Sequence, residues 1–349
     1  MPGNRAAKVT VDLAALQHNF QQVKKYAPDS KIMPVIKANA YGHGLLPVAE
    51  SLTDADGFAV AQLSEAIVLR ENGIDKPITV FQGFANREQL EKIIHHSLRP
   101  AISQLWQIDL LEACQQTTPI DIWIKVNTGM GRLGFQPDDV DICNQRLQKL
   151  KFINQTGLMM HFANADVPAH VSNQLQIEGF LKLSRRYKVQ TSVSNSAAII
   201  SELCTSQDWV RPGIMLYGCS PLQGKTAAEL NLKPVMSVQA ELIAINDLKK
   251  GQTVGYGDSW VCPQDMPVGI VNIGYGDGYP RHARAAPVAV NGQLCHLIGR
   301  VSMDSVAVDL RGIKAECGDV VECWGRQVPA DEVAACAETI SYELLCNMG

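Results

Sequence analysis

The strongest constraint on the fold is a regular alternation of short apolar runs and helix-like segments over the first two thirds of the chain. Eight strand-like runs recur at a spacing of about 25 residues. They are Ile32–Lys37, Gly57–Ala61, Pro77–Gln82, Arg99–Ser103, Ile120–Val126, Gly157–Phe162, Thr191–Ser194 and Trp209–Leu216. Eight strands, each followed by a helix or a gap of helix length, are typical of an α/β protein with a (β/α)₈ TIM-like barrel of roughly 250 residues.

The segments between the strands support this interpretation. Leu63–Asn72 and Arg87–His95 have helical patterns, and Ser172–Tyr187 places apolar side chains at helical spacing. A doubly wound sheet is the alternative, but no G-x-G-x-x-G motif follows the first strand.

After about residue 230 the pattern changes to short strands separated by turn signals such as Asn291-Gly292. The expected strands are Val235–Ala244, Val268–Ile273, Ala286–Val290, Leu297–Val301, Ser305–Leu310 and Asp319–Cys323, with helical periodicity returning only at Asp331–Thr339. We therefore expect a barrel over residues 12–228 and a mostly-β domain over residues 229–349. The strand within residues 1–11 is expected to pack on the β domain, and Asp12 is the natural N-cap of a helix over Asp12–Lys25.

Composition excludes several functions. The 349 residues carry a formal net charge of −4, which gives no electrostatic reason to bind nucleic acid or anionic lipid. No run of about 18 apolar residues occurs, so no membrane span is expected, and the N-terminus lacks the apolar core of a signal peptide, which favours the cytoplasm. The ten cysteines have no metal-ligand spacing. We expect no metal site, and cysteines that serve mostly as small buried hydrophobes.

Chemistry in this fold is located at the C-terminal ends of the barrel strands. Lys37 closes the first strand, where desolvation lowers a lysine pKa and makes the amine a candidate Schiff-base nucleophile, although a lysine reaching out to solvent has the same position. Arg132 stands among three glycines after the fifth strand and is a candidate anion ligand or a solvated side chain. His161, near the end of the sixth strand, fits an acid–base, ring-stacking or core role.

Further candidates follow the last two strands. Asn195-Ser196 and Gly213-Ile214 are small or polar residues at the places where this fold usually binds phosphate, and Arg211 lies on the eighth strand. In the β region, Tyr256 and Tyr275 stand in glycine-rich turns. Each of these signals is weak alone.

Taken together, these motifs closely resemble those of bacterial alanine racemases over nearly the whole chain. Val35–Gly44 resembles the family's pyridoxal-phosphate attachment signature. The other matching motifs, in the family's order, are Lys125–Phe135, Met160–Asp166, Ser194–Ala198, Arg211–Gly218, Gly255–Asp258, Ile273–Arg281, Gly299–Asp304 and Ile340–Tyr342. The resemblance implies a pyridoxal 5′-phosphate enzyme of fold type III that interconverts L- and D-alanine as a head-to-tail homodimer with shared active sites.

The resemblance also implies roles for particular residues. Lys37 is expected to hold the cofactor as a Schiff base and to act as one base, with Tyr256 of the partner subunit as the second. Arg211 is expected at the pyridine nitrogen, His161 against the ring, and Arg132 beside the substrate carboxylate and the cofactor's phenolic oxygen. The remaining expected site residues are Tyr41, Asn195, Ser196, Gly213, Ile214 and Tyr342 for cofactor and phosphate, Met303 and Tyr275 for substrate, Asp166, Arg281 and Arg300 at the entrance, and Lys125 as a carbamylated lysine.

Two departures and several alternatives stay open. Ser192 stands where some members have His, and the chain ends at Gly349, where members usually continue; neither is expected to touch the core chemistry. A serine or broad-specificity racemase is one alternative, although such relatives resemble periplasmic proteins with signal peptides. A pyridoxal-phosphate carrier of the same barrel is another, but carriers lack the β domain. The sequence fits both D-alanine biosynthesis for the cell wall and alanine catabolism.

Overall fold

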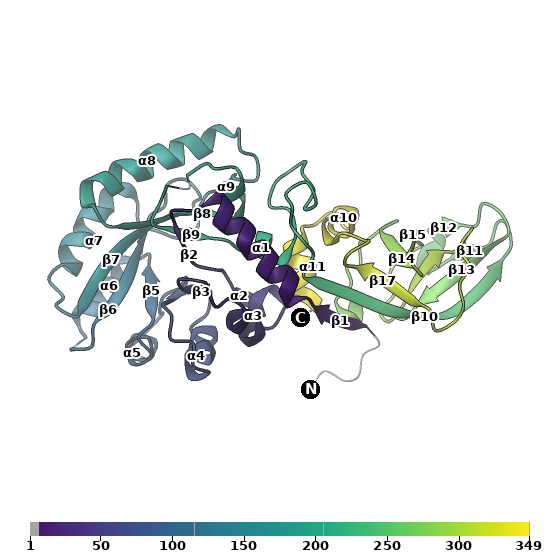
Figure 1. Ribbon diagram of the computed structural model, residues 1–349, viewed down its shortest axis with the longest axis horizontal. Helices are drawn as coiled ribbons and strands as arrows, with labels where there is room; N and C mark the ends of the chain where they lie inside the picture. Colours follow the sequence, from purple (N-terminus) through teal and green to yellow (C-terminus); the bar gives the residue numbers. More distant parts are fainter. Residues whose placement is uncertain (1–6, 115, 205, 349) are drawn as a thin grey trace.

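The computed structural model describes residues 7–114, 116–204 and 206–348. Figure 1 shows a barrel with surrounding helices on one side and an elongated antiparallel sheet on the other. The first residues of the predicted N-terminal strand, 1–6, lie outside the described residues. Within the described part of the chain, no helix is long and apolar enough to cross a membrane.

The barrel is a parallel sheet of eight short strands in the order β2-β9-β8-β7-β6-β5-β4-β3. A parallel bridge from Val35 to Ala59, with a 2.9 Å hydrogen bond from the Ile36 N–H to the Ala59 carbonyl, joins the first of these strands to the last. The strands are β2 (Lys31–Ile32), β3 (Phe58–Val60), β4 (Ile78–Val80), β5 (Arg99–Ile102), β6 (Ile120–Lys125), β7 (Ile153–Met159), β8 (Gln190–Asn195) and β9 (Trp209–Arg211). The predicted barrel is therefore confirmed.

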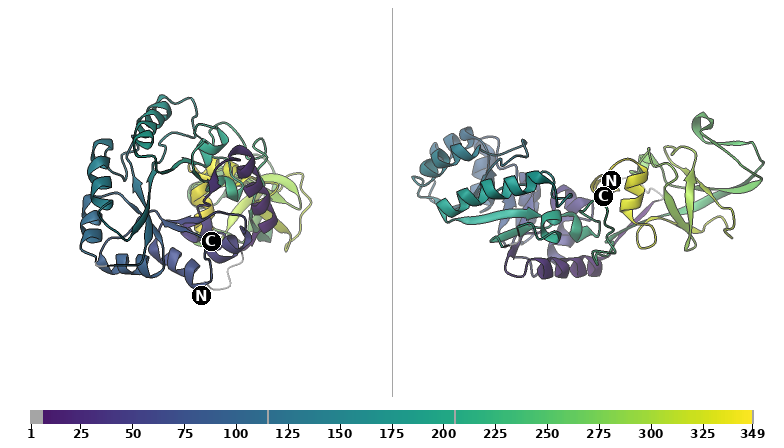
Figure 2. Two further views of the ribbon diagram at one scale, coloured as in Figure 1. Left: turned by 60° about the vertical axis from the view of Figure 1, so that its left-hand side comes forward. Right: turned by 90° about the horizontal axis from the view of Figure 1, so that it is seen from above.

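Helices surround this sheet, as the left view of Figure 2 shows. They are α1 (Leu13–Tyr26), α3 (Leu45–Ser51), α4 (Leu63–Glu71), α5 (Arg87–His95), α6 (Leu105–Glu112), α7 (Val140–Leu147), α8 (Val171–Tyr187), the short turns α2 (Lys37–Tyr41) and α9 (Ser196–Ile200), and the 3₁₀ turns η1 (Pro137–Asp139) and η2 (Ile214–Tyr217). Asp12 caps α1 as predicted, because its side chain accepts a 2.9 Å hydrogen bond from the Ala15 N–H.

The second sheet is antiparallel, in the order β1-β10-β13-β16-β15-β14-β17, and β17 also pairs with β10. Its strands are β1 (Lys8–Val11), β10 (Met236–Leu248), β13 (Met266–Val271), β14 (Pro287–Val290), β15 (Gln293–Ile298), β16 (Val306–Asp309) and β17 (Val320–Trp324). A hairpin of β11 (Thr253–Val254) and β12 (Trp260–Val261) lies at the end remote from the barrel (Figure 1). The N-terminal strand β1 pairs with β10, while the division of the chain at residues 228 and 229 stays a prediction.

Three local predictions need correction. The first strand does not continue to Lys37, because the chain turns there into α2. The eighth strand ends at Arg211, where Pro212 and Gly213 lead into η2. The predicted helix Asp331–Thr339 is α10 (Ala330–Cys336), and a second helix, α11 (Ser341–Met348), was not predicted. In Figures 1 and 2 this second helix lies between the barrel and the antiparallel sheet.

The cysteines behave as the sequence predicts. All ten are free thiols, six of them are buried, and only Cys317 is classed as exposed. They therefore contribute packing rather than crosslinks.

Candidate active site

A cavity of about 460 Å³ opens at the C-terminal ends of the barrel strands, which is a typical size for a small-molecule site. Eleven predicted site residues line it: Lys37, Tyr41, Lys125, Arg132, His161, Asn195, Ser196, Arg211, Gly213, Ile214 and Tyr342. All but Tyr342 come from the barrel, and Tyr342 is supplied by α11. The barrel and the end of the chain thus build the cavity together.

Four cations line this cavity, namely Lys37, Lys125, Arg132 and Arg211, and no Asp or Glu is among its lining residues. Burial, and next the charge of Arg132, lowers the pKa of Lys37. Burial lowers the pKa of Lys125 to about 8, with further contributions from Arg211, Arg132 and Lys37. Cations in such proximity repel one another, so the cavity is suited to a ligand with several negative charges.

Arg211 is held rigidly at the floor of the cavity and is 3% exposed. Its guanidinium donates to the Ser192 hydroxyl at 2.5 Å and to the backbone carbonyls of Met160 at 2.6 Å and Val193 at 3.1 Å. Burial lowers the pKa of Arg211 to about 9, which leaves it protonated at neutral pH. Ser192, which stands where some family members have His, thus contacts a predicted site residue directly.

His161 follows the end of β7 by two residues. Its Nδ1 atom lies 3.5 Å from the Arg211 guanidinium. Burial, and then the charges of Arg211 and three other cations, lowers the pKa of His161 well below its usual range. The imidazole is consequently neutral at pH 7, so it is suited to packing against a ligand ring rather than to donating a proton.

Another part of the cavity lining offers hydroxyl groups and backbone that suit an anion. The hydroxyl of Ser196 accepts a 2.8 Å hydrogen bond from the Gly213 N–H. A Cβ atom at Gly213 would lie 2.8 Å from the Tyr41 hydroxyl, so only glycine leaves room there. Burial raises the pKa values of Tyr41 and Tyr342, and both phenols stay protonated as donors. Hydroxyl donors and the backbone at Gly213-Ile214 fit a phosphate group.

Arg132 and Lys125 are connected by a short loop. Lys125 ends β6 and is 8% exposed. The chain returns at Phe135, whose N–H donates to the Lys125 carbonyl at 2.9 Å. Gly134 has a φ of 131°, and a Cβ there would lie 2.6 Å from the Asn127 nitrogen, so this loop needs glycine to close.

A second cluster of predicted residues lies on the antiparallel sheet, outside the lining of the Lys37 cavity. Tyr256 belongs to η3 (Tyr256–Asp258), between β11 and β12, and is 66% exposed. The Arg300 guanidinium packs over Gly257, where a Cβ would lie 3.2 Å from it. Tyr256 thus sits on the hairpin remote from the barrel (Figure 1).

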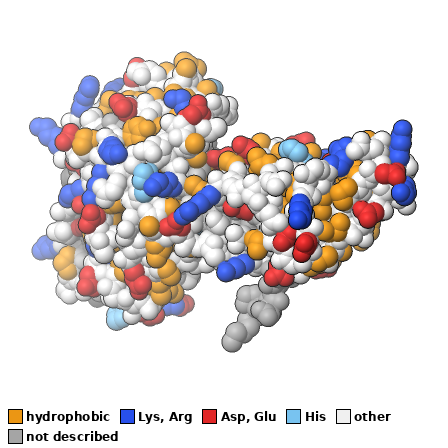
Figure 3. Space-filling view, turned by 45° about the vertical axis from the view of Figure 1, so that its right-hand side comes forward, with side chains coloured by type: hydrophobic (Ala, Val, Ile, Leu, Met, Phe, Trp, Pro, Cys, Tyr) orange, Lys and Arg blue, Asp and Glu red, His pale blue; other side chains and the backbone are white. Residues whose placement is uncertain are grey.

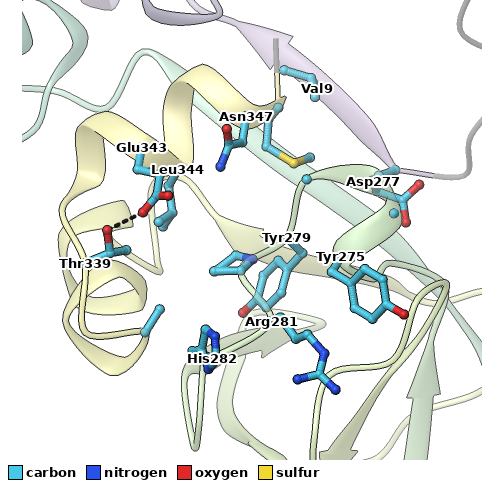
Figure 4. Close-up of a pocket in the computed structure, with 16 residues that line it drawn as sticks. Val9, Tyr275, Asp277, Tyr279, Arg281, His282, Thr339, Glu343, Leu344 and Asn347 are labelled. Atoms are coloured by element: carbon cyan, nitrogen blue, oxygen red, sulfur yellow. Dashed lines mark hydrogen bonds between the residues drawn. The ribbon is translucent and has the colours of Figure 1, made fainter.

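The other members of this cluster are close to one another. Tyr275 belongs to η4 (Tyr275–Asp277), and its N–H donates to the Ser302 carbonyl at 3.1 Å. Arg281 lies 5.8 Å from the centre of the Tyr275 ring, and Figure 4 shows the two side by side. The neighbouring Met303 is 54% exposed. Tyr275 and Arg281 line a separate hollow of about 910 Å³, which Figure 4 shows, and none of these side chains lines the cation-rich cavity.

Asp166 lies apart from both groups, in an adjacent cavity of about 660 Å³ that also contains His161, Asn195 and Tyr342. It accepts a 2.9 Å hydrogen bond from Gln223. Its place beside the main cavity is compatible with a position on the approach to the site.

Seven residues that line the main cavity were not predicted as site residues: Val35, Ala61, Phe81, Gln82, Leu133, Met159 and Met160. Phe81 and Gln82 follow the last residue of β4, Val80, directly. The rule that active sites form at the C-terminal ends of barrel strands would have found them.

Comparisons with known proteins agree with this architecture. The family model described as alanine racemase, N-terminal domain, matches residues 11–221, and that of the alanine racemase C-terminal domain matches residues 235–349. The curated alanine racemase of Nitrosococcus oceani is 46% identical over 341 residues, which cover 97% of this chain and 96% of that protein. That of Coxiella burnetii is 43% identical over 353 residues, covering 99% and 97%.

Solved structures of alanine racemases are also similar to this chain over nearly its whole length. The crystal structure of the biosynthetic alanine racemase from Pseudomonas aeruginosa is 40% identical, superposes with a TM-score of 0.96, and is matched over 99% of this chain and 97% of that one. The alanine racemase from Acinetobacter baumannii is also 40% identical, with a TM-score of 0.92. Sequence, fold and coverage place this chain in the alanine racemase family.

Proposed function

We propose that this chain interconverts L- and D-alanine with pyridoxal 5′-phosphate, as a homodimer whose sites each combine Lys37 with Tyr256 of the partner subunit. The observation that carries the proposal is the cavity itself, where eleven predicted residues meet, four of which are cations, and no Asp or Glu is among the lining residues. A phosphate, a phenolic oxygen and a substrate carboxylate would neutralise those charges.

The residues present fit this cofactor. Tyr41, Tyr342 and Ser196 would hold the phosphate through their hydroxyl groups, beside the backbone at Gly213-Ile214, where glycine leaves room. When bound, the cofactor acidifies the Cα–H of an amino acid attached to it. Arg211 has donors only and stays charged, so it would leave the pyridine nitrogen unprotonated.

Racemisation needs one base on each face of the reacting carbon. The Lys37 Nζ would take or return the Cα proton on one face, and its pKa, lowered by burial and by Arg132, favours the neutral amine that this role requires. The Tyr256 Oη of the partner subunit would serve the other face. Support for a shared site comes from the exposure of Tyr256 and from its position on a hairpin remote from its own barrel.

Subunit mixing tests the shared site. Lys37→Ala and Tyr256→Ala homodimers should both be nearly inactive. When the two are mixed and re-equilibrated, about half the dimers are mixed, and each of these has both lesions at one site and an intact second site. Activity should recover to roughly a quarter of the wild-type value per chain. No recovery despite proven subunit exchange, or full activity in a monomer, would contradict the proposal.

Substrate choice is tested separately. We expect racemisation of alanine to exceed that of serine, lysine and arginine in kcat/KM. A preference for any of the other three would favour the broad-specificity or serine alternative. Absence of all racemisation, with cofactor bound, would favour the carrier alternative.

We further propose that Lys125 is carbamylated. Carbon dioxide reacts with a neutral amine, and a pKa lowered to about 8 gives Lys125 a substantial neutral fraction near neutral pH. The product is an anion beside Arg132, which replaces a repulsion by an attraction. A ¹³C carbamate signal after incubation with labelled bicarbonate should appear in the wild type and disappear in Lys125→Ala. Density for an unmodified ammonium with chloride beside it would overturn this assignment.

A further inference from the structure

The segment after Lys37 is a left-handed turn made without glycine. Ala38, Asn39, Ala40 and Tyr41 have φ values between 52° and 54°. L-residues adopt this conformation at an energetic cost, and four in succession persist only where the surroundings hold them. The turn joins the expected cofactor lysine to a tyrosine of the same cavity, so whatever holds it also orients both side chains.

His43 holds this turn from the inside. Its Nδ1 lies 3.0 Å from the Ala40 carbonyl oxygen and 2.9 Å from the Tyr41 carbonyl oxygen. Carbonyl oxygens only accept hydrogen bonds, so Nδ1 carries the proton. The Nε2 atom is then an acceptor, and it is buried without a hydrogen-bond partner among the described residues. The imidazole is therefore used as a donor to two backbone carbonyls, and this use leaves its other nitrogen unsatisfied.

The ring of His43 also joins a stack behind the cavity. It lies 4.5 Å from the Tyr217 ring centre, and Tyr217 lies 4.7 Å from that of Tyr41. The Tyr217 hydroxyl donates to the Val35 carbonyl at 3.1 Å. Val35 precedes Lys37 by two residues, so this one cluster contacts the chain on both sides of the lysine.

A weaker contact holds the outer side of the turn. The Glu65 carboxylate accepts a 3.3 Å hydrogen bond from the Asn39 N–H. This contact is exposed to solvent, whereas His43 is 4% exposed. Backbone bonds and the Asn39 amide, which accepts from the Leu45 N–H at 2.9 Å, also hold the turn, but His43 is the buried side chain that bonds to its carbonyls.

We propose that His43 is a positioning residue, whose neutral imidazole locks the left-handed turn and so directs Lys37 and the Tyr41 hydroxyl into the cavity. The part of this inference that concerns the cofactor rests on the proposed function, while the part that concerns the turn does not. His43 itself is not among the residues that line the cavity.

Two substitutions separate the donor from the bulk of the side chain. His43→Asn places an amide N–H near the position of Nδ1, and His43→Leu keeps a similar volume without a donor. In the holoenzyme, His43→Leu should raise the amide hydrogen-exchange rates of residues 42–44 at least tenfold. It should also raise the dissociation constant of the cofactor at least tenfold. His43→Asn should stay within about threefold of wild type in both. His95→Leu, on the exposed side of α5, is the control.

Wild-type exchange in His43→Leu, or equal loosening in both variants, would overturn the positioning role. If His43→Leu does not fold, His43→Gln replaces it, because its amide lies near Nε2 and leaves both carbonyls without a donor. If the exchange effect appears but the wild type binds no pyridoxal phosphate, the proposed function fails and the role of His43 in the turn stands.

Discussion

The barrel mouth and the Tyr256 cluster differ in how completely one chain builds them. Around Lys37, eleven predicted residues enclose one cavity. Around Tyr256, the predicted residues are on the surface, with Tyr256, Met303 and Tyr275 exposed by 66%, 54% and 39%. In the proposed mechanism Tyr256 needs a desolvated environment, which the proposed partner subunit would supply, while the enclosed half can bind a small molecule alone.

Charge distinguishes the cavity from the outer surface of the molecule. The cavity contains four cations and no acid. In the space-filling view of Figure 3, by contrast, Lys and Arg are interspersed with Asp and Glu over the face shown. Like charges are tolerated together only where a ligand or a modification neutralises them, so the barrel mouth is built around anions.

The largest expected effects come from substituting the proposed base in each region, which should change activity and cofactor attachment differently. Lys37→Ala should lose roughly 10³-fold or more in activity, together with the absorption band of the lysine-bound cofactor that borohydride bleaches. Tyr256→Phe should lose roughly 10²–10⁴-fold in activity but keep the band, because it removes only a proton-transferring hydroxyl. Visible spectra and racemisation rates measure both.

Lys149→Ala, at an exposed position, is the control and should change neither property. A reducible band that survives in Lys37→Ala would move cofactor attachment to another lysine. Loss of the band in Tyr256→Phe would contradict the proposal that the Lys37 cavity holds the cofactor while Tyr256 only transfers a proton.

A second test uses pH on the barrel side. Burial lowers the pKa of His43 from 6.5 to about 4, so between these values the unfolded chain binds more protons than the folded chain. The free energy of unfolding therefore rises with pH through this window. From pH 7 to pH 4 the wild type should lose up to about 3 kcal/mol relative to His43→Asn. Urea unfolding at several pH values measures the difference, and parallel curves for the two proteins would refute it.

The smallest effect comes from one methyl group in each region. Gly213→Ala should weaken cofactor binding about tenfold, because the new Cβ meets the Tyr41 hydroxyl at 2.8 Å. Gly257→Ala should leave cofactor affinity unchanged and lower kcat a few-fold, since its Cβ displaces Arg300 beside Tyr256. Gly179→Ala in α8, which meets no atom within 4 Å, is the control. Equal effects of the first two on cofactor affinity would contradict the division between regions.

The barrel could be predicted because its strands are buried on both faces and appear as continuous apolar runs. Phe58–Val60 and Ile78–Val80 are buried at every residue. Position at strand ends then identified Lys37 and Arg132 as candidates. The start of α1 was predictable because Asp12 is a strong N-cap.

Other features leave no such trace in the sequence. Tyr342 came only from the family resemblance, because the short helix Ser341–Met348 that carries it lacks a long apolar stripe. The left-handed turn after Lys37 contains no glycine, the residue by which such backbone is usually recognised. The contact of Ser192 with Arg211 depends on the pairing between β8 and β9, which the sequence alone does not reveal.

The pairing of β1 with β10 sets an order of events during synthesis. Lys8 pairs with Gln239, so β1 is synthesised before the whole barrel sequence and has no partner until β10 has followed. At bacterial and eukaryotic elongation rates this delay is roughly 10 to 50 s. The barrel must therefore fold, or be protected by chaperones, while β1, at the N-terminal end of α1, is still unpaired. Pairing of β1 with β10 is the step that joins the N-terminal strand to the antiparallel sheet of the last third of the chain.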